Sequence, residues 1–202
     1  MRKGKVKGGK DWSKFTHHYI PAPNASQGFH GILLAMMEHY GVGKKVLLLS
    51  EPEAVIPVFQ KQFPDTTFRV TDYSGRACED FDFDLNIFTR SCQKYDIVLS
   101  QATLEHVCRP SVAIENMAER CEVGGHVVLH TVGPTCPLHC LPIDCVRFFK
   151  DFYYNLTKYL PIEVVAYLES GCHHFVVYRK VKGTHGLQDS SPSDEQPRTC
   201  RR

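Results

Sequence analysis

Two neighbouring groups of polar side chains in this 202-residue chain have the types and spacing that chemistry requires. Ser100 and Gln101 come directly after an apolar run, and Glu105 and His106 follow a few residues later. If the run is a strand of an open α/β sheet, Ser100 and Gln101 leave it on the side where such sheets bind ligands. An imidazole changes charge near neutral pH, so His106 is the first candidate for a general base or a substrate contact. The alternative is a structural histidine whose hydrogen bonds only hold the fold together.

A separate cluster, further along the chain, combines sulfur and imidazole ligands. Cys136, His139, Cys140 and Cys145 lie close together in the sequence, and thiolates with imidazole suit zinc. A single Cys-x₃-Cys spacing without a second matching pair is more simply explained by reduced cysteines in a loop and a helix. We therefore predict no metal site. The nine cysteines form an odd set without a paired CxxC framework, so we expect reduced thiols throughout.

The hydrophobic pattern predicts the elements that must position these side chains. Continuous apolar runs predict buried strands at residues 46–49, 68–71, 95–100 and 127–129, with a looser segment around 81–88. Helical spacing predicts helices at residues 30–40 and 55–63, from Pro110 to a stop at Gly124-Gly125, and after a cap at Asp144. Residues 162–168 and 173–178 predict an antiparallel hairpin. Strands that alternate with helices indicate a parallel α/β sheet.

One segment resembles a known family. Residues 95–107, YDIVLSQATLEHV, resemble the fourth-strand signature of the methyltransferase type 11 group of class I S-adenosylmethionine-dependent methyltransferases. The segments Glu122–Gly125 and His139–Phe148 also look like those before and after that family's fifth strand, so the resemblance covers about residues 30–180. It implies a Rossmann-like, seven-stranded, mostly parallel sheet with helices on both faces and an antiparallel C-terminal hairpin. It also implies methyl transfer from S-adenosyl-L-methionine to an unidentified acceptor, small molecule or macromolecule.

The same resemblance implies cofactor contacts for two acidic positions. Asp72, after the second strand, is similar to the acid that accepts hydrogen bonds from the ribose hydroxyls, with a turn-capping aspartate as the alternative. Asp84 and Leu85 resemble the pair that meets adenine, with a solvated acidic loop as the alternative. Ser100 and Gln101 would complete the nucleoside site at the strand end. Because the cofactor's sulfonium already makes the methyl group electrophilic, positioning of the acceptor can matter more than a protein base; His106 is the catalytic candidate.

The turn after the first strand departs from the family pattern. Where a glycine-rich turn is expected, the chain has Ser50-Glu51-Pro52-Glu53-Ala54, with no glycine and with a proline that removes an amide donor. Ser50 and Glu51 would still contact the cofactor, and Glu51 would bind the cofactor's amino group. Two hypotheses follow: a methyltransferase with an altered turn, or a catalytically inactive methyltransferase-like fold that acts as a binding or scaffold module. A dinucleotide oxidoreductase is disfavoured because no G-x-G-x-x-G follows a strand.

Composition sets the expected domain organisation and surroundings. We expect a basic arm and lead-in at residues 1–29, one methyltransferase-like domain at 30–182, and a disordered polar tail at 183–202. The net charge of +2 gives no reason to expect nucleic acid beyond a weak signal from the basic arm. No apolar run has the length of a membrane span, so we expect a cytoplasmic protein, with a nuclear location as the alternative, and no membrane partner. The loop 133–142 and the helix after it should form much of the acceptor pocket.

Overall fold

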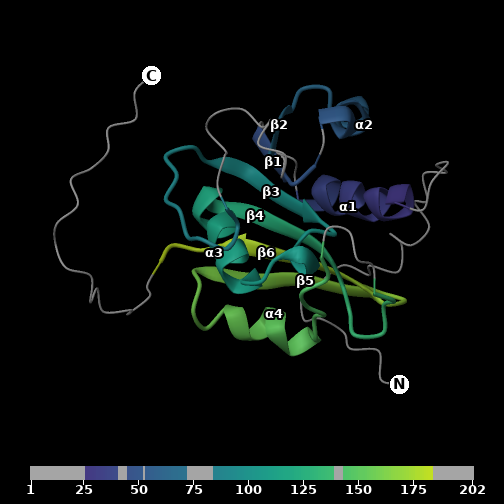
Figure 1. Ribbon diagram of the computed structural model, residues 1–202. Coiled ribbons are helices and arrows are strands. Elements are labelled where there is room, and N and C mark those ends of the chain that lie inside the picture. The colour runs from purple at the N-terminus through teal and green to yellow at the C-terminus, as the bar shows by residue number, and fades with distance from the viewer. Residues whose placement is uncertain (1–25, 41–44, 52, 72–83, 139–142, 184–202) are drawn as a thin grey trace.

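Six strands form one sheet in the computed structural model, which describes residues 26–40, 45–51, 53–71, 84–138 and 143–183 (Figure 1). The order across the sheet is β2-β1-β3-β4-β6-β5. The strands are β1 (Lys45–Leu49), β2 (Thr67–Thr71), β3 (Tyr95–Gln101), β4 (Cys121–Val132), β5 (Ile162–Ser170) and β6 (His173–Lys180). The first four are parallel, and β5 and β6 form the antiparallel hairpin at one edge. The α/β architecture, the interior position of β1 and the hairpin confirm the predictions.

The expected seven-stranded sheet is wrong for the described part of the chain, which contributes six strands. Residues 84–88, from the looser segment, form no strand. Backbone groups in and just after this segment bond to the side chain of Asn116 instead. Its Nδ2 donates to the carbonyl of Ile87 (2.9 Å), and its Oδ1 accepts from the amide of Thr89 (2.8 Å). Because the asparagine satisfies these backbone groups, they need no ladder partner.

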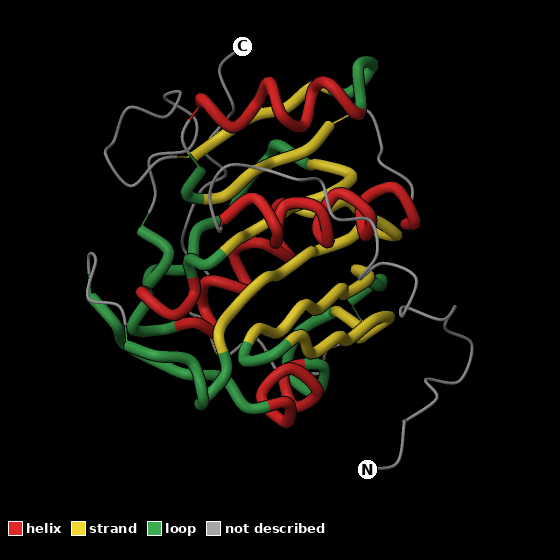
Figure 2. Tube along the Cα trace, turned by 90° about the vertical axis from the view of Figure 1, so that its right-hand side faces the viewer, coloured by secondary structure: helices red, strands yellow, loops and turns green. Residues whose placement is uncertain are grey.

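Helices cover both faces of the sheet (Figures 1 and 2). The helices are α1 (Ser26–Tyr40), α2 (Ile56–Gln62), α3 (Pro110–Arg120) and α4 (Lys150–Leu156), with short 3₁₀ turns η2 (Glu53–Val55) and η4 (Leu104–His106). Alternate residues of β1 point to opposite sides, so Val46 and Leu48 pack with α1 and α2, whereas Leu47 and Leu49 pack with α3 and α4. None of the described helices has both the length and the apolar composition of a membrane span.

Two predicted helix boundaries are wrong. The helix α3 ends at Arg120, and Cys121, expected on the helix, begins β4. Gly124 has a φ of 87° inside this long strand, so the glycine pair belongs to an irregular part of β4 and does not end the helix. Asp144 caps no helix, since it forms an ion pair with Arg147 and α4 begins at Lys150.

The strand order places a crossover between β1 and β3. From β1 the chain moves outward to β2 and then returns to the other side of β1 to form β3. In open α/β sheets, ligands bind beyond the carboxyl ends of the strands at such a crossover. The first 25 residues and residues 184–202 lie outside the described part of the chain, so the predicted arm and tail remain predictions.

Candidate functional site

The carboxyl ends of three strands meet beside the crossover. In the parallel registers, Leu49 of β1 lies opposite Thr71 of β2 and Ser100 of β3. The next residues along the chain, Ser50 in the turn after β1 and Gln101 at the end of β3, therefore lie at one edge of the sheet. The predicted cofactor contacts of the first and third strands are thus brought together by the fold.

The turn after β1 has a glycine-like backbone although it contains no glycine. Ser50 has a φ of 56°, in the left-handed region that glycine normally supplies. Two hydrogen bonds to Thr71 hold this conformation: the amide of Ser50 donates to the side-chain Oγ1 (3.1 Å), and the amide of Glu51 donates to the main-chain oxygen (3.1 Å). The end of β2 therefore supports the turn that the missing glycines leave strained.

Glu51 is a buried carboxyl group at this edge. Only 8% of the residue is exposed, and burial raises its pKa to about 7. A carboxyl group with such a pKa is half neutral at neutral pH, and a nearby cation would favour its charged form. Glu51 is thus a candidate partner for a ligand amino group.

The end of β3 carries polar atoms without hydrogen-bond partners. Ser100 is 1% exposed, and neither its Oγ nor the Oε1 of Gln101 makes a hydrogen bond. Ala102 follows with a φ of 46°, and among the described non-glycine residues only Ser50 and Ala102 have a positive φ. Buried unsatisfied polar atoms and strained backbone are both costly, and both gather at functional sites. Here a positive φ follows each of β1 and β3, and the unsatisfied atoms lie at the end of β3.

Glu105 and His106 lie on η4, where the loop after β4 is attached. The carbonyl of Glu105 accepts hydrogen bonds from the amides of Cys145 (2.7 Å) and Val146 (3.1 Å). The Nδ1 of His106 bonds to the carbonyl of Ile143, so Nδ1 carries the proton in the neutral ring and Nε2 has the lone pair. The structure thus places the candidate base against the segment predicted to form the acceptor pocket.

The buried side chain of Glu105 lies among polar groups of that segment. It is 0% exposed. The pKa of Arg147 is raised, first by the hydrogen bond to Asp144 and then by the charges of Asp144 and Glu105. Glu105 thereby links η4 electrostatically to the loop before α4.

Two of the remaining predicted contacts, Asp84 and Leu85, lie among the described residues. Asp72 lies outside the described residues. Asp84 is exposed, and its carboxylate accepts hydrogen bonds from the amide and Nδ2 of Asn86 (2.8 and 2.9 Å), which lower its pKa. Leu85 is half-buried and packs against the core on the α3 side. Asn86 Oδ1 accepts from the amide of Arg109, just before α3, so this loop reaches the helix start that follows η4.

The sulfur chemistry differs from the prediction. Cys136 forms a disulfide with Cys172, and Cys92 is also disulfide-bonded, so the expectation of reduced thiols throughout is wrong. The sulfurs of Cys145 and Cys108 lie 3.3 Å apart. His139 and Cys140 lie outside the described residues. Of the four residues considered as zinc ligands, Cys136 is therefore paired with Cys172, and Cys145 contacts Cys108.

Sequence reasoning missed two residues of the site. Thr71 was seen only as the end of a strand, and Ala102 only as part of the family-like segment. Neither has a side chain that suggests chemistry, and their contributions, a hydroxyl acceptor and a strained backbone, depend on the fold. One signal in the sequence pointed to Thr71: the turn after the first strand has no glycine where a glycine-rich turn is expected, so another residue has to support it.

Solved structures match this fold, although no known family profile and no curated protein sequence matches the chain. The N-methyltransferase NodS from Bradyrhizobium japonicum, in complex with S-adenosyl-L-homocysteine, has a TM-score of 0.56 at 15% identity over 85% of this chain and 98% of NodS. An O-methyltransferase family protein from Burkholderia thailandensis gives 0.54 at 14% identity, over 85% of this chain. TehB from Haemophilus influenzae gives 0.52 at 16% identity, over 76% of this chain. The chain spans 63% of the length of each of the last two. These likenesses show the class I methyltransferase fold.

Proposed function

We propose that this chain is an S-adenosylmethionine-dependent methyltransferase, similar to the type 11 group, that binds its cofactor despite the altered first turn. One observation carries the proposal: β1 and β3, which flank the crossover, are each followed by a residue with a positive φ, and β3 ends in buried polar atoms that have no hydrogen-bond partner. A bound nucleoside would offer those atoms the hydrogen bonds that the protein does not supply. The likeness of the fold to methyltransferases, one of them in complex with S-adenosyl-L-homocysteine, supports this cofactor class.

The residues present fit such a cofactor at three points. Ser100 Oγ can donate or accept a hydrogen bond, and Gln101 Oε1 can accept one from a hydroxyl or an amino group. Glu51 provides a carboxylate for the amino group of the methionine part. Asp72 remains the predicted ribose contact from the sequence alone. When bound, the cofactor supplies a methyl group that its sulfonium already makes electrophilic.

The loop after β4 and η4 is the proposed acceptor side. We propose that His106, with its proton on Nδ1, takes a proton from the acceptor through Nε2. Its bond to the carbonyl of Ile143 fixes the ring and the tautomer, which is how a catalytic histidine is commonly oriented.

A second candidate function is a methyltransferase-like binding module without catalysis. The favouring observation is the buried Glu51 in place of a glycine, because its carboxyl group adds bulk and charge where the cofactor approaches the turn. Such a module would keep the fold and lose the ligand. The two candidates differ in one measurable property, affinity for the cofactor.

Calorimetric titration of the full chain with S-adenosyl-L-methionine and S-adenosyl-L-homocysteine tests the proposal without knowledge of the acceptor. We expect heat of binding for both ligands and a rise in melting temperature at millimolar ligand. Asp72→Ala should weaken binding about ten- to a hundredfold, as loss of charge-assisted hydrogen bonds does. No heat and no thermal shift from a folded protein would favour the binding module. Binding unaffected by Asp72→Ala would refute that contact alone.

A further inference from the structure

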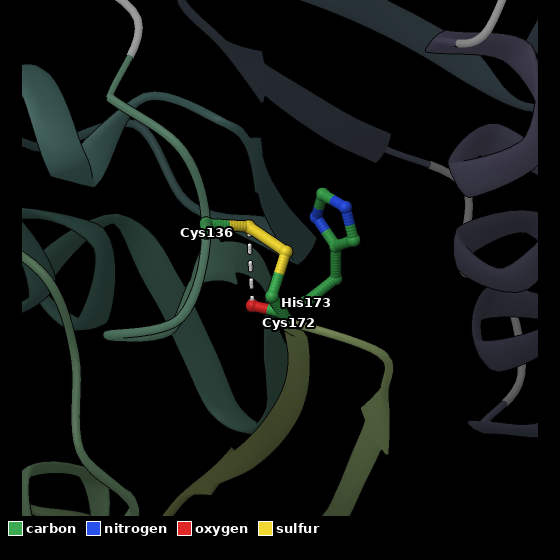
Figure 3. Close-up of side chains that lie close together, drawn as sticks. All are labelled: Cys136, Cys172 and His173. Atoms are coloured by element: carbon green, nitrogen blue, oxygen red, sulfur yellow. Dashed lines mark hydrogen bonds between the residues drawn. A yellow bond between two sulfur atoms is a disulfide. The ribbon is translucent and has the colours of Figure 1, made fainter.

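Two cysteines and a histidine converge where the loop after β4 meets the β5–β6 turn. Cys136 lies in that loop, Cys172 in the turn, and His173 is the first residue of β6 (Figure 3). One ligating atom from each, the two sulfurs and a ring nitrogen, lies within 4.8 Å of the others. Two sulfurs and an imidazole nitrogen are the ligands that Zn²⁺ prefers. In the structure the two sulfurs are joined as a disulfide.

Main-chain hydrogen bonds hold these residues in place independently of the sulfur–sulfur bond. The amide of Gly133 donates to the carbonyl of Cys172 (2.7 Å), and the amide of Cys136 donates to the carbonyl of Gly133 (3.1 Å). Gly133 allows this close approach, because a Cβ there would lie 2.6 Å from Nε2 of His174. The register that pairs Val132 with His173 continues the same contact. The three ligands would therefore stay together after the disulfide opens.

The histidine ligand has a second residue that orients it. Nδ1 of His173 lies 3.1 Å from Nε2 of His130, so the two rings share a hydrogen bond. His130 is 2% exposed and stacks on Phe175, with ring centroids 4.7 Å apart. This contact restricts the rotation of the His173 ring.

We propose that the reduced protein binds one Zn²⁺ ion, or a similar thiophilic divalent cation, through Cys136, Cys172 and His173. The disulfide and the metal-bound form are then alternative states of one site. A dithiol or phosphine reductant opens the disulfide to two thiols and is itself oxidised. Metal binding then displaces the two thiol protons, and the sulfurs separate to about 3.8 Å, as two ligands at about 2.3 Å in tetrahedral geometry require.

Three protein ligands leave one tetrahedral position for water or another ligand. Either state joins the loop after β4 to the end of the hairpin. The inference rests on the cluster alone. Absence of cofactor binding would leave it intact.

Metal titration of the full chain tests the site. The protein is reduced with a phosphine, freed of reductant without oxygen, and titrated with Co²⁺ and Zn²⁺, and bound metal is counted after gel filtration. We expect one more equivalent in the reduced protein than in the oxidised protein, with a thiolate-to-cobalt charge-transfer band. Three variants, Cys136→Ser, Cys172→Ser and His173→Ala, should each weaken metal binding at least about tenfold. Loss of a residue that only hydrogen-bonds to a metal ligand already costs about ten- to a hundredfold, and these variants lose a ligand itself.

The matched control uses the other close pair of described cysteines, Cys108 and Cys145. The double variant Cys108→Ser/Cys145→Ser should keep the additional equivalent. Equal metal content in oxidised and reduced protein would overturn the proposal, as would full-affinity binding by folded His173→Ala. Loss of the metal in the control but not in Cys136→Ser would also overturn it. If a cysteine variant does not fold by circular dichroism, His173→Ala and His173→Gln decide the question.

Discussion

The backbone amide of Ser50 donates a hydrogen bond to Oγ1 of Thr71, 3.1 Å away, and so ties the turn after β1 to the last residue of β2. The hydrogen bond stabilises the turn, because Ser50 has a φ of 56°, which a residue with a Cβ adopts less readily than glycine. A glycine-type turn has thus been kept by a neighbouring side chain. This relationship explains how a turn without glycine keeps a positive φ at the end of β1.

Removal of that hydroxyl should loosen the turn. Thr71→Val keeps the shape of the side chain but leaves the Ser50 amide without an acceptor, which we expect to lower the free energy of unfolding by about 1–2 kcal/mol. Urea denaturation followed by circular dichroism measures the change. Thr67→Val, at the exposed first residue of the same strand, is the control and should stay within about 0.5 kcal/mol of the parent protein. Equal losses in both variants would mean that the Ser50–Thr71 bond contributes nothing special.

The buried carboxyl group of Glu51 should make stability depend on pH. Burial raises its folded-state pKa from 4.5 to about 7, so the folded protein holds a proton that the unfolded chain releases between these values. Stability contributed by the protonated form is therefore present below about pH 4.5 and is lost as the pH rises through 7. Glu51→Gln cannot ionise, so it should be more stable than the parent at pH 8, by about 1–3 kcal/mol, and nearly equal at pH 4.5.

Urea titrations at the two pH values measure this difference. Glu53→Gln is the control, because Glu53 is exposed two residues away on η2. A gain for Glu51→Gln of the same size at both pH values would show that ionisation is not its cause. A gain shared by the control would point to the general charge of the turn.

The parts predicted from sequence were those fixed by periodicity. Buried parallel strands are continuous apolar runs, so β1 and β3 and the position of Ser100 at a strand end followed from the pattern. The positive φ of Ser50 did not, because it is imposed by Thr71 from another strand. The Cys136–Cys172 pairing is also set by tertiary structure, since cysteine connectivity cannot be deduced from spacing. Gly124-Gly125 was predicted to end a helix, but α3 already ends at Arg120 and the glycines lie within β4.

The proposed base should be separable from the cofactor site. His106→Ala removes Nε2 and the hydrogen bond to the carbonyl of Ile143, a kind of bond that contributes about 0.5–1.5 kcal/mol, so we expect only a small loss of stability. Affinity for S-adenosyl-L-homocysteine should be unchanged. Transfer of labelled methyl groups from S-adenosyl-L-methionine to a panel of small-molecule and protein acceptors should fall about a hundredfold or more. His39→Ala, on α1, is the control. A large loss of stability with normal transfer would make His106 a structural residue.

Ser100 gives the sharpest test, because the proposal predicts opposite effects of one change on stability and on binding. Its buried Oγ makes no hydrogen bond within the protein, so Ser100→Ala removes a desolvated group without breaking a contact. The free energy of unfolding should therefore stay the same or rise by up to about 1 kcal/mol. If the hydroxyl contacts the cofactor, affinity for S-adenosyl-L-homocysteine should fall by about 1 kcal/mol, or roughly fivefold, in calorimetric titration. Ser111→Ala, on the exposed start of α3, should change neither quantity. A Ser100→Ala protein that is less stable and binds the ligand as well as the parent would show that this hydroxyl serves the fold and not the ligand.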